Sequence, residues 1–251
     1  MFAYSTPLRA AFYNRDPRQV ARALLGKVLV RKTPHGVLAG RIVETEAYLG
    51  KNDAAAHSAA GKTARNSVLF GPPGIAYVYF IYGNHYCLNV SCLPDGIPGG
   101  ILFRALEPIE GLEQMAKARG IVWRAAALPV QASAGGDGRS KSGFAVEKEP
   151  DLKRISLLKQ ISSGPGRMSE AMGITRERDN GKDFTSKRSD LQIVDDGYRV
   201  HGVIVTPRIG IVKSAEQPLR YLIAGSPFVS GRATAPRNKL NATPARARIS
   251  A

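Results

Sequence analysis

Cysteine is nearly absent from this sequence. The 251 residues include two cysteines, Cys87 and Cys92, with four residues between them. Two thiols cannot build a disulfide framework, and their spacing is not that of a zinc site. A disulfide-stabilised secreted module and a cysteine-bound metal are therefore excluded. We interpret the pair as partly buried free thiols in a protein of a reducing compartment.

Long apolar runs are also missing. No stretch of about 18 apolar residues predicts a membrane-spanning helix, and residues 1–7 lack the basic and apolar regions of a secretory signal. Phosphate-binding, dinucleotide-binding and zinc-protease motifs are absent, and the four histidines are too scattered to predict a metal site. The simplest enzyme compatible with this inventory is a hydrolase that uses a carboxylate and needs neither cofactor nor metal.

Acidic residues are scarce relative to basic ones. Lys and Arg total 36 against 20 Asp and Glu, which gives a net charge of +16 and an isoelectric point near 10.1. Such a surface attracts polyanions, and nucleic acid is the commonest polyanionic partner. Solubility alone, or binding to membranes or ribosomes, would also account for the charge.

The pattern of apolar and turn residues predicts a mixed fold. Strands are expected over residues 27–32, 37–49, 75–82, 85–92, 100–106, 203–212 and 219–224. Helices are expected from Pro17, capped by Asp16, to just before Gly26, over 108–119 and 151–160, and from the 162–167 loop to about Gly173.

These elements favour an α+β class, as a single mixed domain with a curved antiparallel β-sheet, a protruding β-hairpin and surrounding helices. We expect this domain over residues 1–231, with a mobile insertion at about 125–149. Residues 232–251 hold five basic residues and no acidic one, which predicts a basic, disordered tail.

The segment 41–50 is the first candidate for chemistry. Strand alternation places Glu44, Glu46 and Tyr48 on one face. This row, beside a loop that carries His57, could form a catalytic face. The alternative is a solvated strand edge.

Tyrosines crowd the predicted hairpin. Alternation places Tyr77, Tyr79 and Ile81 on one face, and Tyr82 stands at the tip, next to the turn residues Gly83 and Asn84. Tyr77 would ordinarily pack into the core, as would Tyr86. An exposed aromatic such as Tyr82 on a basic protein can instead wedge between base pairs.

The segment 162–167 reads Ser-Ser-Gly-Pro-Gly-Arg and leads into a predicted helix. Free N–H groups in such a loop can bind an anion, and Arg167 adds a positive charge. A plain helix cap is the alternative interpretation.

Taken together and in order, eight segments resemble the alkyladenine (3-methyladenine) DNA glycosylase family. They are RIVETEAYLG at 41–50, AHS around His57, FGPPG at 70–74, the hairpin at 77–89, LFRALEP at 102–108, SGPGR at 163–167, PRIG at 207–210 and GSPFV at 225–229. The resemblance covers roughly residues 12–230.

The resemblance implies a cofactor-free, monofunctional enzyme that removes alkylated or deaminated purines from double-stranded DNA. Glu46 would activate the attacking water, and Tyr82 would fill the gap that the flipped nucleotide leaves. The remaining roles fall on a base pocket and on backbone contacts. The pocket residues would be Tyr48, His57, Tyr79, Asn89, Ile209 and Gly210, and the phosphate contacts Arg104, Arg167 and Arg65.

Two positions depart from the family pattern. Asn84 stands beside the wedge, where methionine is common, and Ala64 replaces an expected proline. We expect a monomer that contacts no membrane and lies in the bacterial cytoplasm on the nucleoid, or in a eukaryotic nucleus. The alternatives are a damage-binding protein without catalysis, a basic RNA- or ribosome-associated protein, and a polysaccharide glycosidase.

Overall fold

The computed structural model describes residues 6–123 and 152–231. The predicted insertion at 125–149 and the predicted tail at 232–251 lie outside these described residues. Across the described part of the chain, no helix is long and apolar enough to cross a membrane.

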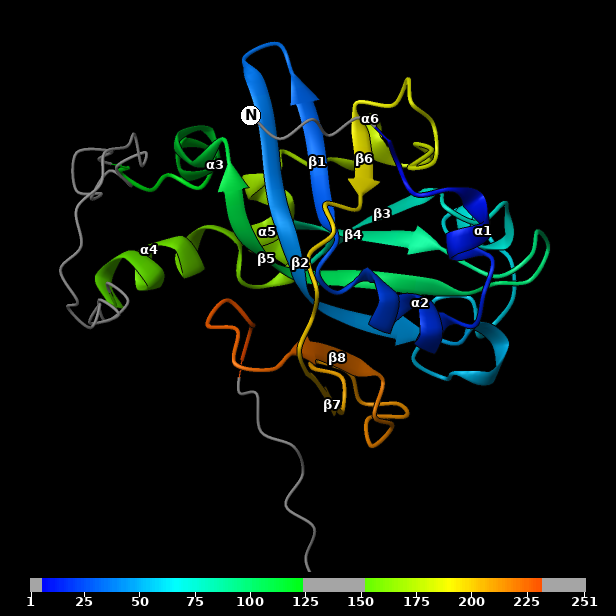
Figure 1. Cartoon of the computed structure of the whole chain (residues 1–251). Coiled ribbons are helices and arrows are strands. Elements are labelled where there is room, and N and C mark those ends of the chain that lie inside the picture. Colours follow the sequence, from blue (N-terminus) through cyan, green and yellow to red (C-terminus); the bar gives the residue numbers. More distant parts are fainter. Residues whose placement is uncertain (1–5, 124–151, 232–251) are drawn as a thin grey trace, which may run out of the picture.

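The architecture is a strongly curved antiparallel sheet with helices at its margins, which confirms the predicted α+β class (Figure 1). The main strand order is β3-β4-β5-β2-β1-β6, and β8 pairs with both β2 and β7. The strands are β1 Val28–Thr33, β2 Gly36–Tyr48, β3 Ala76–Ile81, β4 His85–Ser91, β5 Gly100–Glu110, β6 Leu191–Val194, β7 Val203–Thr206 and β8 Arg220–Ile223.

The helices are short and lie around the sheet (Figure 1). They are α1 Ala10–Tyr13, α2 Pro17–Leu24, α3 Leu112–Ala118, α4 Leu152–Ser162, α5 Pro165–Ala171 and α6 Arg176–Asp179, with 3-10 turns at Gly50–Asn52 and Ser67–Phe70. Helix α2 is built as predicted: the Asp16 carboxylate accepts a hydrogen bond from the Arg18 N–H at 2.8 Å, and Pro17 occupies the first helical position.

The helix predicted over 108–119 begins too early. Pro108 pairs with Gly40 as a continuation of β5, and α3 begins only after Gly111, which adopts a positive φ of 76°. The long partner β2 explains this, because it offers backbone groups for an extended β5 to pair with. The strand predicted over 203–212 is also too long: it ends at Thr206, before Pro207, which has no N–H to donate.

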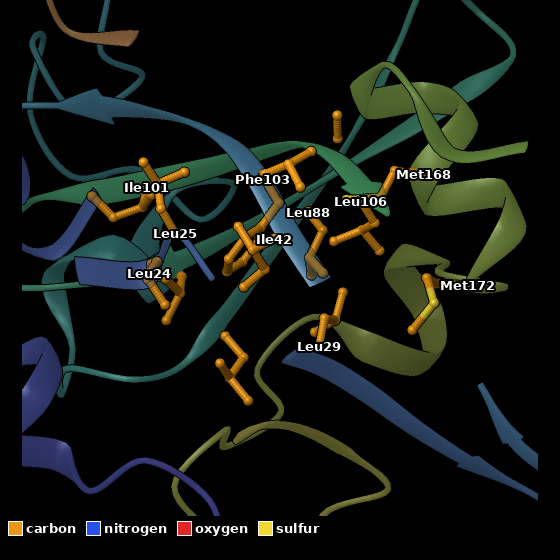
Figure 2. Close-up of a cluster of buried hydrophobic side chains, with 14 of the residues drawn as sticks. Leu24, Leu25, Leu29, Ile42, Leu88, Ile101, Phe103, Leu106, Met168 and Met172 are labelled. Atoms are coloured by element: carbon orange, nitrogen blue, oxygen red, sulfur yellow. The ribbon is translucent and has the colours of Figure 1, made fainter. Parts of the chain in front are cut away.

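The core lies between the sheet and helices α2 and α5. Figure 2 shows Leu24 and Leu25 approaching Ile42 and Ile101 from one side, while Met168 of α5 and Met172, just after α5, approach from the other. These side chains are at most 4% exposed. Their packing fixes β2 and β5 against each other, and both strands carry charged residues toward the site described below.

The β3–β4 hairpin closes differently from the prediction. Ile81 pairs with His85, so the loop is Tyr82-Gly83-Asn84, and positive φ angles occur at Tyr82 (56°) and Gly83 (74°) rather than at Asn84. A bulky residue rarely adopts this left-handed conformation, so the turn holds Tyr82 in a strained geometry. Its side chain is 80% exposed at the tip.

Candidate active site

A cavity of about 560 Å³ opens between the β3–β4 hairpin, β5 and three loops. The loops follow β2, precede α5 and follow β7. Most of the residues predicted for the site line this cavity. They are Tyr48, His57, Tyr79, Tyr82, Asn89, Arg104, Arg167, Ile209 and Gly210.

Glu46 lies directly behind the residues that line the cavity. It is fully buried, and its carboxylate accepts two hydrogen bonds and forms one ion pair with cavity-lining residues. The Tyr48 hydroxyl donates to Oε2 at 3.0 Å, the Ile209 N–H donates to Oε1 at 2.8 Å, and Arg104 Nη1 lies 3.1 Å from Oε1. The alternative of a solvated strand edge is therefore wrong for this segment.

The electrostatics of Glu46 combine opposing effects. Burial raises the pKa of Glu46, while the Arg104 guanidinium, the Ile209 N–H and the Tyr48 hydroxyl favour its charged form, and the net direction is upward. A carboxylate offers about four lone-pair sites, and the two hydrogen bonds and the ion pair do not fill all of them. Glu46 is thus a buried carboxylate that can still accept a proton.

Arg104 connects Glu46 to a second buried carboxylate. Its Nε donates to Glu44 Oε1 at 2.8 Å, so both carboxylates lie on the same face of β2, as alternation predicts. The β2–β5 register shifts here, because Glu44 pairs with Ala105 and Thr45 with Phe103. Arg104 is the extra residue of this bulge, and the bulge directs its side chain toward the two glutamates. Its predicted contact with a phosphate stays a prediction.

Aromatic rings form another part of the cavity lining. The His57 ring lies 4.5 Å from the Tyr79 ring between centroids, and His57 Nδ1 lies 3.0 Å from the Tyr77 hydroxyl. Burial, and then the positive charge of Arg65, lower the pKa of His57, so the imidazole is neutral at pH 7. Tyr77 is buried, as the core interpretation predicts, but it also lines the cavity.

Asn89 closes the floor next to these rings. Its Nδ2 donates to the Tyr77 carbonyl at 3.1 Å and contacts the Cys87 carbonyl at 3.5 Å, so the side-chain amide is held in one orientation. Both predicted free thiols are buried, and Cys87 lines the cavity beside Asn89.

The rim carries positive charge from two sides. Arg167 is exposed at the start of α5, and Arg65 is exposed with its guanidinium carbon 5.9 Å from the Tyr79 ring centroid. Two N–H groups of the predicted anion-binding loop have partners within the fold: those of Ser163 and Gly164 donate to the carbonyls of Lys159 and Arg104. The binding of an anion by this loop stays a prediction.

The structure adds a buried ion pair that the sequence analysis missed. Arg208 donates to both oxygens of Asp53, at 2.5 and 2.8 Å, and its guanidinium carbon lies 4.6 Å from the centroid of the Tyr48 ring. Asp53 in turn accepts the N–H groups of Leu49 and Ala55. This pair fastens the loop after β2 to the loop after β7. The one sequence signal for this pair is the PRIG segment at 207–210, in which Arg208 precedes the predicted pocket residue Ile209.

Within residues 6–123 and 152–231, no group of three or more His, Cys, Asp or Glu side chains is arranged to hold a metal ion. The cavity offers aromatic rings, amides, guanidinium groups and one shielded carboxylate. That set suits the binding of a planar ring and a proton transfer next to it.

Comparison with known proteins gives consistent results. The family model described as methylpurine-DNA glycosylase matches residues 11–227. A protein of Koribacter versatilis named "Putative 3-methyladenine DNA glycosylase" is 60% identical over 230 residues, which covers 92% of this chain and 96% of the relative. Proteins of the same name from Methanocella arvoryzae and Burkholderia cenocepacia are each 42% identical over 88% of this chain, covering 94% and 89% of their own lengths.

Proposed function

The chain belongs to the methylpurine-DNA glycosylase family, and from this premise we propose that it flips alkylated or deaminated purines out of duplex DNA and hydrolyses their N-glycosidic bond. The substrates we propose are 3-methyladenine, 7-methylguanine, hypoxanthine and ethenoadenine. One observation carries the proposal: a fully buried carboxylate, Glu46, lies behind an aromatic cavity, accepts hydrogen bonds from two of its lining residues and is ion-paired with a third.

Base flipping explains the shape of the site. A purine inside the duplex cannot be reached, and extracting it costs a few kcal/mol, least for a damaged or mispaired base. Tyr82, 80% exposed at the hairpin tip, would occupy the vacated position and keep the stack continuous. The flipped base would then stack among Tyr48, His57 and Tyr79, with Ile209 and Gly210 closing the pocket.

The chemistry would run through Glu46. Its carboxylate takes a proton from water, the water oxygen bonds to the anomeric carbon, and the N-glycosidic electron pair leaves with the purine. The carboxylate also stabilises the positive charge that develops on the sugar. A purine alkylated to a cation leaves as a neutral base, whereas neutral hypoxanthine needs a proton first.

Selection would combine attraction and exclusion. A cationic purine stacks favourably on Tyr48 and Tyr79. Asn89, whose amide is held by the Tyr77 carbonyl, would clash with the exocyclic amine of normal guanine. Arg104, Arg167 and Arg65 would contact the DNA backbone.

The reaction would stop at base removal. No lysine lines the described cavity, so strand cleavage through a Schiff base is not expected. We further propose that the protein acts as a monomer, without cofactor, on double-stranded DNA of the bacterial nucleoid in the cytoplasm. Its surplus of positive charge supports binding to a polyanion.

The leading alternative is a protein that binds damage without cleaving it. The two are distinguished by incubating the protein with a labelled duplex that carries one hypoxanthine or one 7-methylguanine. Free base and an alkali-labile site in equal amounts support the glycosylase. Binding without either product on every alkylated or deaminated purine tested would leave the non-catalytic alternative.

A further inference from the structure

Glu44 is a buried carboxylate that the proposed mechanism does not use. It lies two residues before Glu46 on β2, is fully buried, and is held by Arg104 and Arg220 and by Ser230. Arg104 Nε donates to Oε1 at 2.8 Å, and Arg220 Nε donates to the same oxygen at 2.7 Å. The Ser230 hydroxyl donates to Oε1 at 2.8 Å and its N–H donates to Oε2 at 2.5 Å.

This cage leaves Arg104 shared between two anions. Its Nε–Glu44 contact, at 2.8 Å, is shorter than its Nη1–Glu46 contact, at 3.1 Å. Its Nη2 also donates to the Ser230 hydroxyl at 3.3 Å. Coulomb interactions add, so the Arg104 cation favours the charged form of Glu46 while the nearby Glu44 anion opposes it.

We propose that Glu44 is a positioning residue that holds Arg104 by its Nε and limits how strongly Arg104 pairs with Glu46, so that Glu46 remains a competent base. This inference rests on the proposed function. Without the Glu44 anion, the stabilisation of the Glu46 carboxylate by Arg104 would no longer be opposed, and a carboxylate so stabilised is a poorer acceptor for the proton of water. Through Ser230, the same cage ties the end of the described domain to the site.

The charged and titratable groups around Glu46 come from every neighbouring element. They are Glu44 and Tyr48 on β2, Cys87 on β4, Arg104 on β5, Arg220 on β8 and Arg208 after β7. Burial raises the pKa of Glu46, Arg104 lowers it, and the nearby negative charge of Glu44 raises it further. Removing the anion should therefore lower this pKa, and removing the cation Arg220 should raise it.

The test is the pH dependence of single-turnover excision, measured with saturating enzyme on a duplex that carries 7-methylguanine. This lesion is already cationic, so the acidic limb reports the protein base rather than protonation of the substrate. We expect Glu44→Gln to move the acidic limb to lower pH by about half a unit, and Arg220→Gln to move it to higher pH by a similar amount. Glu107→Gln, the same change at a half-exposed position on β5, is the control and should leave the limb in place.

The opposite directions separate this role from a structural one, because loss of folded protein lowers the amplitude without moving the limb. If the charge variants do not fold, Ser230→Ala decides: it removes the hydroxyl that donates to Glu44 and accepts from Arg104 Nη2, and the acidic limb should move away from that of the wild type. If the acidic limbs of the folded variants coincide with that of the wild type, the inference is overturned. If the wild type releases no base at any pH, the proposed function fails instead.

Discussion

The backbone N–H of Ile209 lies 2.8 Å from Oε1 of Glu46, although 163 positions separate the two residues in the chain. Ile209 lines the cavity, and Glu46 lies behind it. This hydrogen bond fixes the orientation of the carboxylate relative to the rim that would contact a bound base. Ile209, on the cavity, and the proposed catalyst Glu46 are thus linked directly, and the predictions below test separate parts of the site.

The hairpin tip should matter for lesions more than for ordinary DNA. Tyr82→Ala removes an 80% exposed ring that would replace the flipped base in the stack, and stacking of this kind is worth about 1–3 kcal/mol. We expect lesion binding to weaken about tenfold or more and binding to an undamaged duplex to change little, as measured by dissociation constants on matched duplexes.

Phe80→Ala is the matched control for this prediction. Phe80 is half-exposed on the same hairpin but outside the cavity lining, and it packs against Tyr86 with ring centroids 5.1 Å apart. It should affect the two duplexes alike. Equal losses on both duplexes with Tyr82→Ala would refute the wedge role.

The Arg208–Asp53 pair should carry much of the stability of the site. Both side chains are fully buried, so removing one partner leaves the other charge without compensation. Asp53→Asn and Arg208→Gln should each lower the free energy of unfolding by about 3–5 kcal/mol, as measured by urea denaturation.

The comparison is the Lys27–Asp195 pair, where Asp195 is half-exposed. Asp195→Asn should cost at most about 1 kcal/mol. Similar losses in the free energy of unfolding for both pairs would show that the buried Arg208–Asp53 pair stabilises the protein no more than an exposed one.

This ion pair also marks the limit of what the sequence could predict. Strand alternation correctly placed Glu44, Glu46 and Tyr48 on one face, because that periodicity is local. The contact between Arg208 and Asp53 spans 155 positions and depends on the pairing of β8 with both β2 and β7. No local pattern encodes such a contact.

The burial of Glu44 and Glu46 was beyond sequence reasoning for a related reason. A carboxylate row on a strand ordinarily faces water, and it is tolerated inside only when cations cancel its charge. Here the cations Arg104 and Arg220 come from β5 and β8. The bulge that aims Arg104 at both glutamates has no signature in the sequence of β5.

Acid should weaken the fold through Asp179. Burial alone would raise its pKa, but Arg31, Lys182 and the Thr175 N–H hold the pKa of Asp179 below its usual value. A carboxylate with a depressed folded-state pKa contributes stability above its unfolded pKa of about 3.9, and loses it as pH falls through the folded value.

The measurement is the free energy of unfolding in urea between pH 7 and pH 2.5. The wild type should lose stability below about pH 4. Asp179→Asn should be less stable at pH 7 and should lose less on acidification. Parallel pH profiles for the two proteins would contradict this assignment.

Gly50 should be irreplaceable at the start of the loop that carries His57. It has a φ of 75°, and a Cβ there would lie 2.0 Å from the Pro98 carbonyl oxygen. Gly50→Ala should cost more than the roughly 1–2 kcal/mol of a left-handed alanine alone, since backbone must also move.

Gly61→Ala isolates the conformational part. Gly61 also has a positive φ, 104°, but nothing lies within 4 Å of its hypothetical Cβ. Thermal or urea unfolding of the two variants should separate them clearly. Equal destabilisation would mean that the close approach to Pro98 is relaxed without cost.

The central claim is that Glu46 activates the attacking water. The most direct test compares single-turnover base release by wild type and by Glu46→Gln on a duplex with one hypoxanthine, with lesion binding measured in parallel. We predict alkali-labile sites from the wild type, a loss of at least about a hundredfold in rate for the variant, and lesion binding retained. Release by Glu46→Gln at the wild-type rate would contradict the account, because the proton would then be taken by another group.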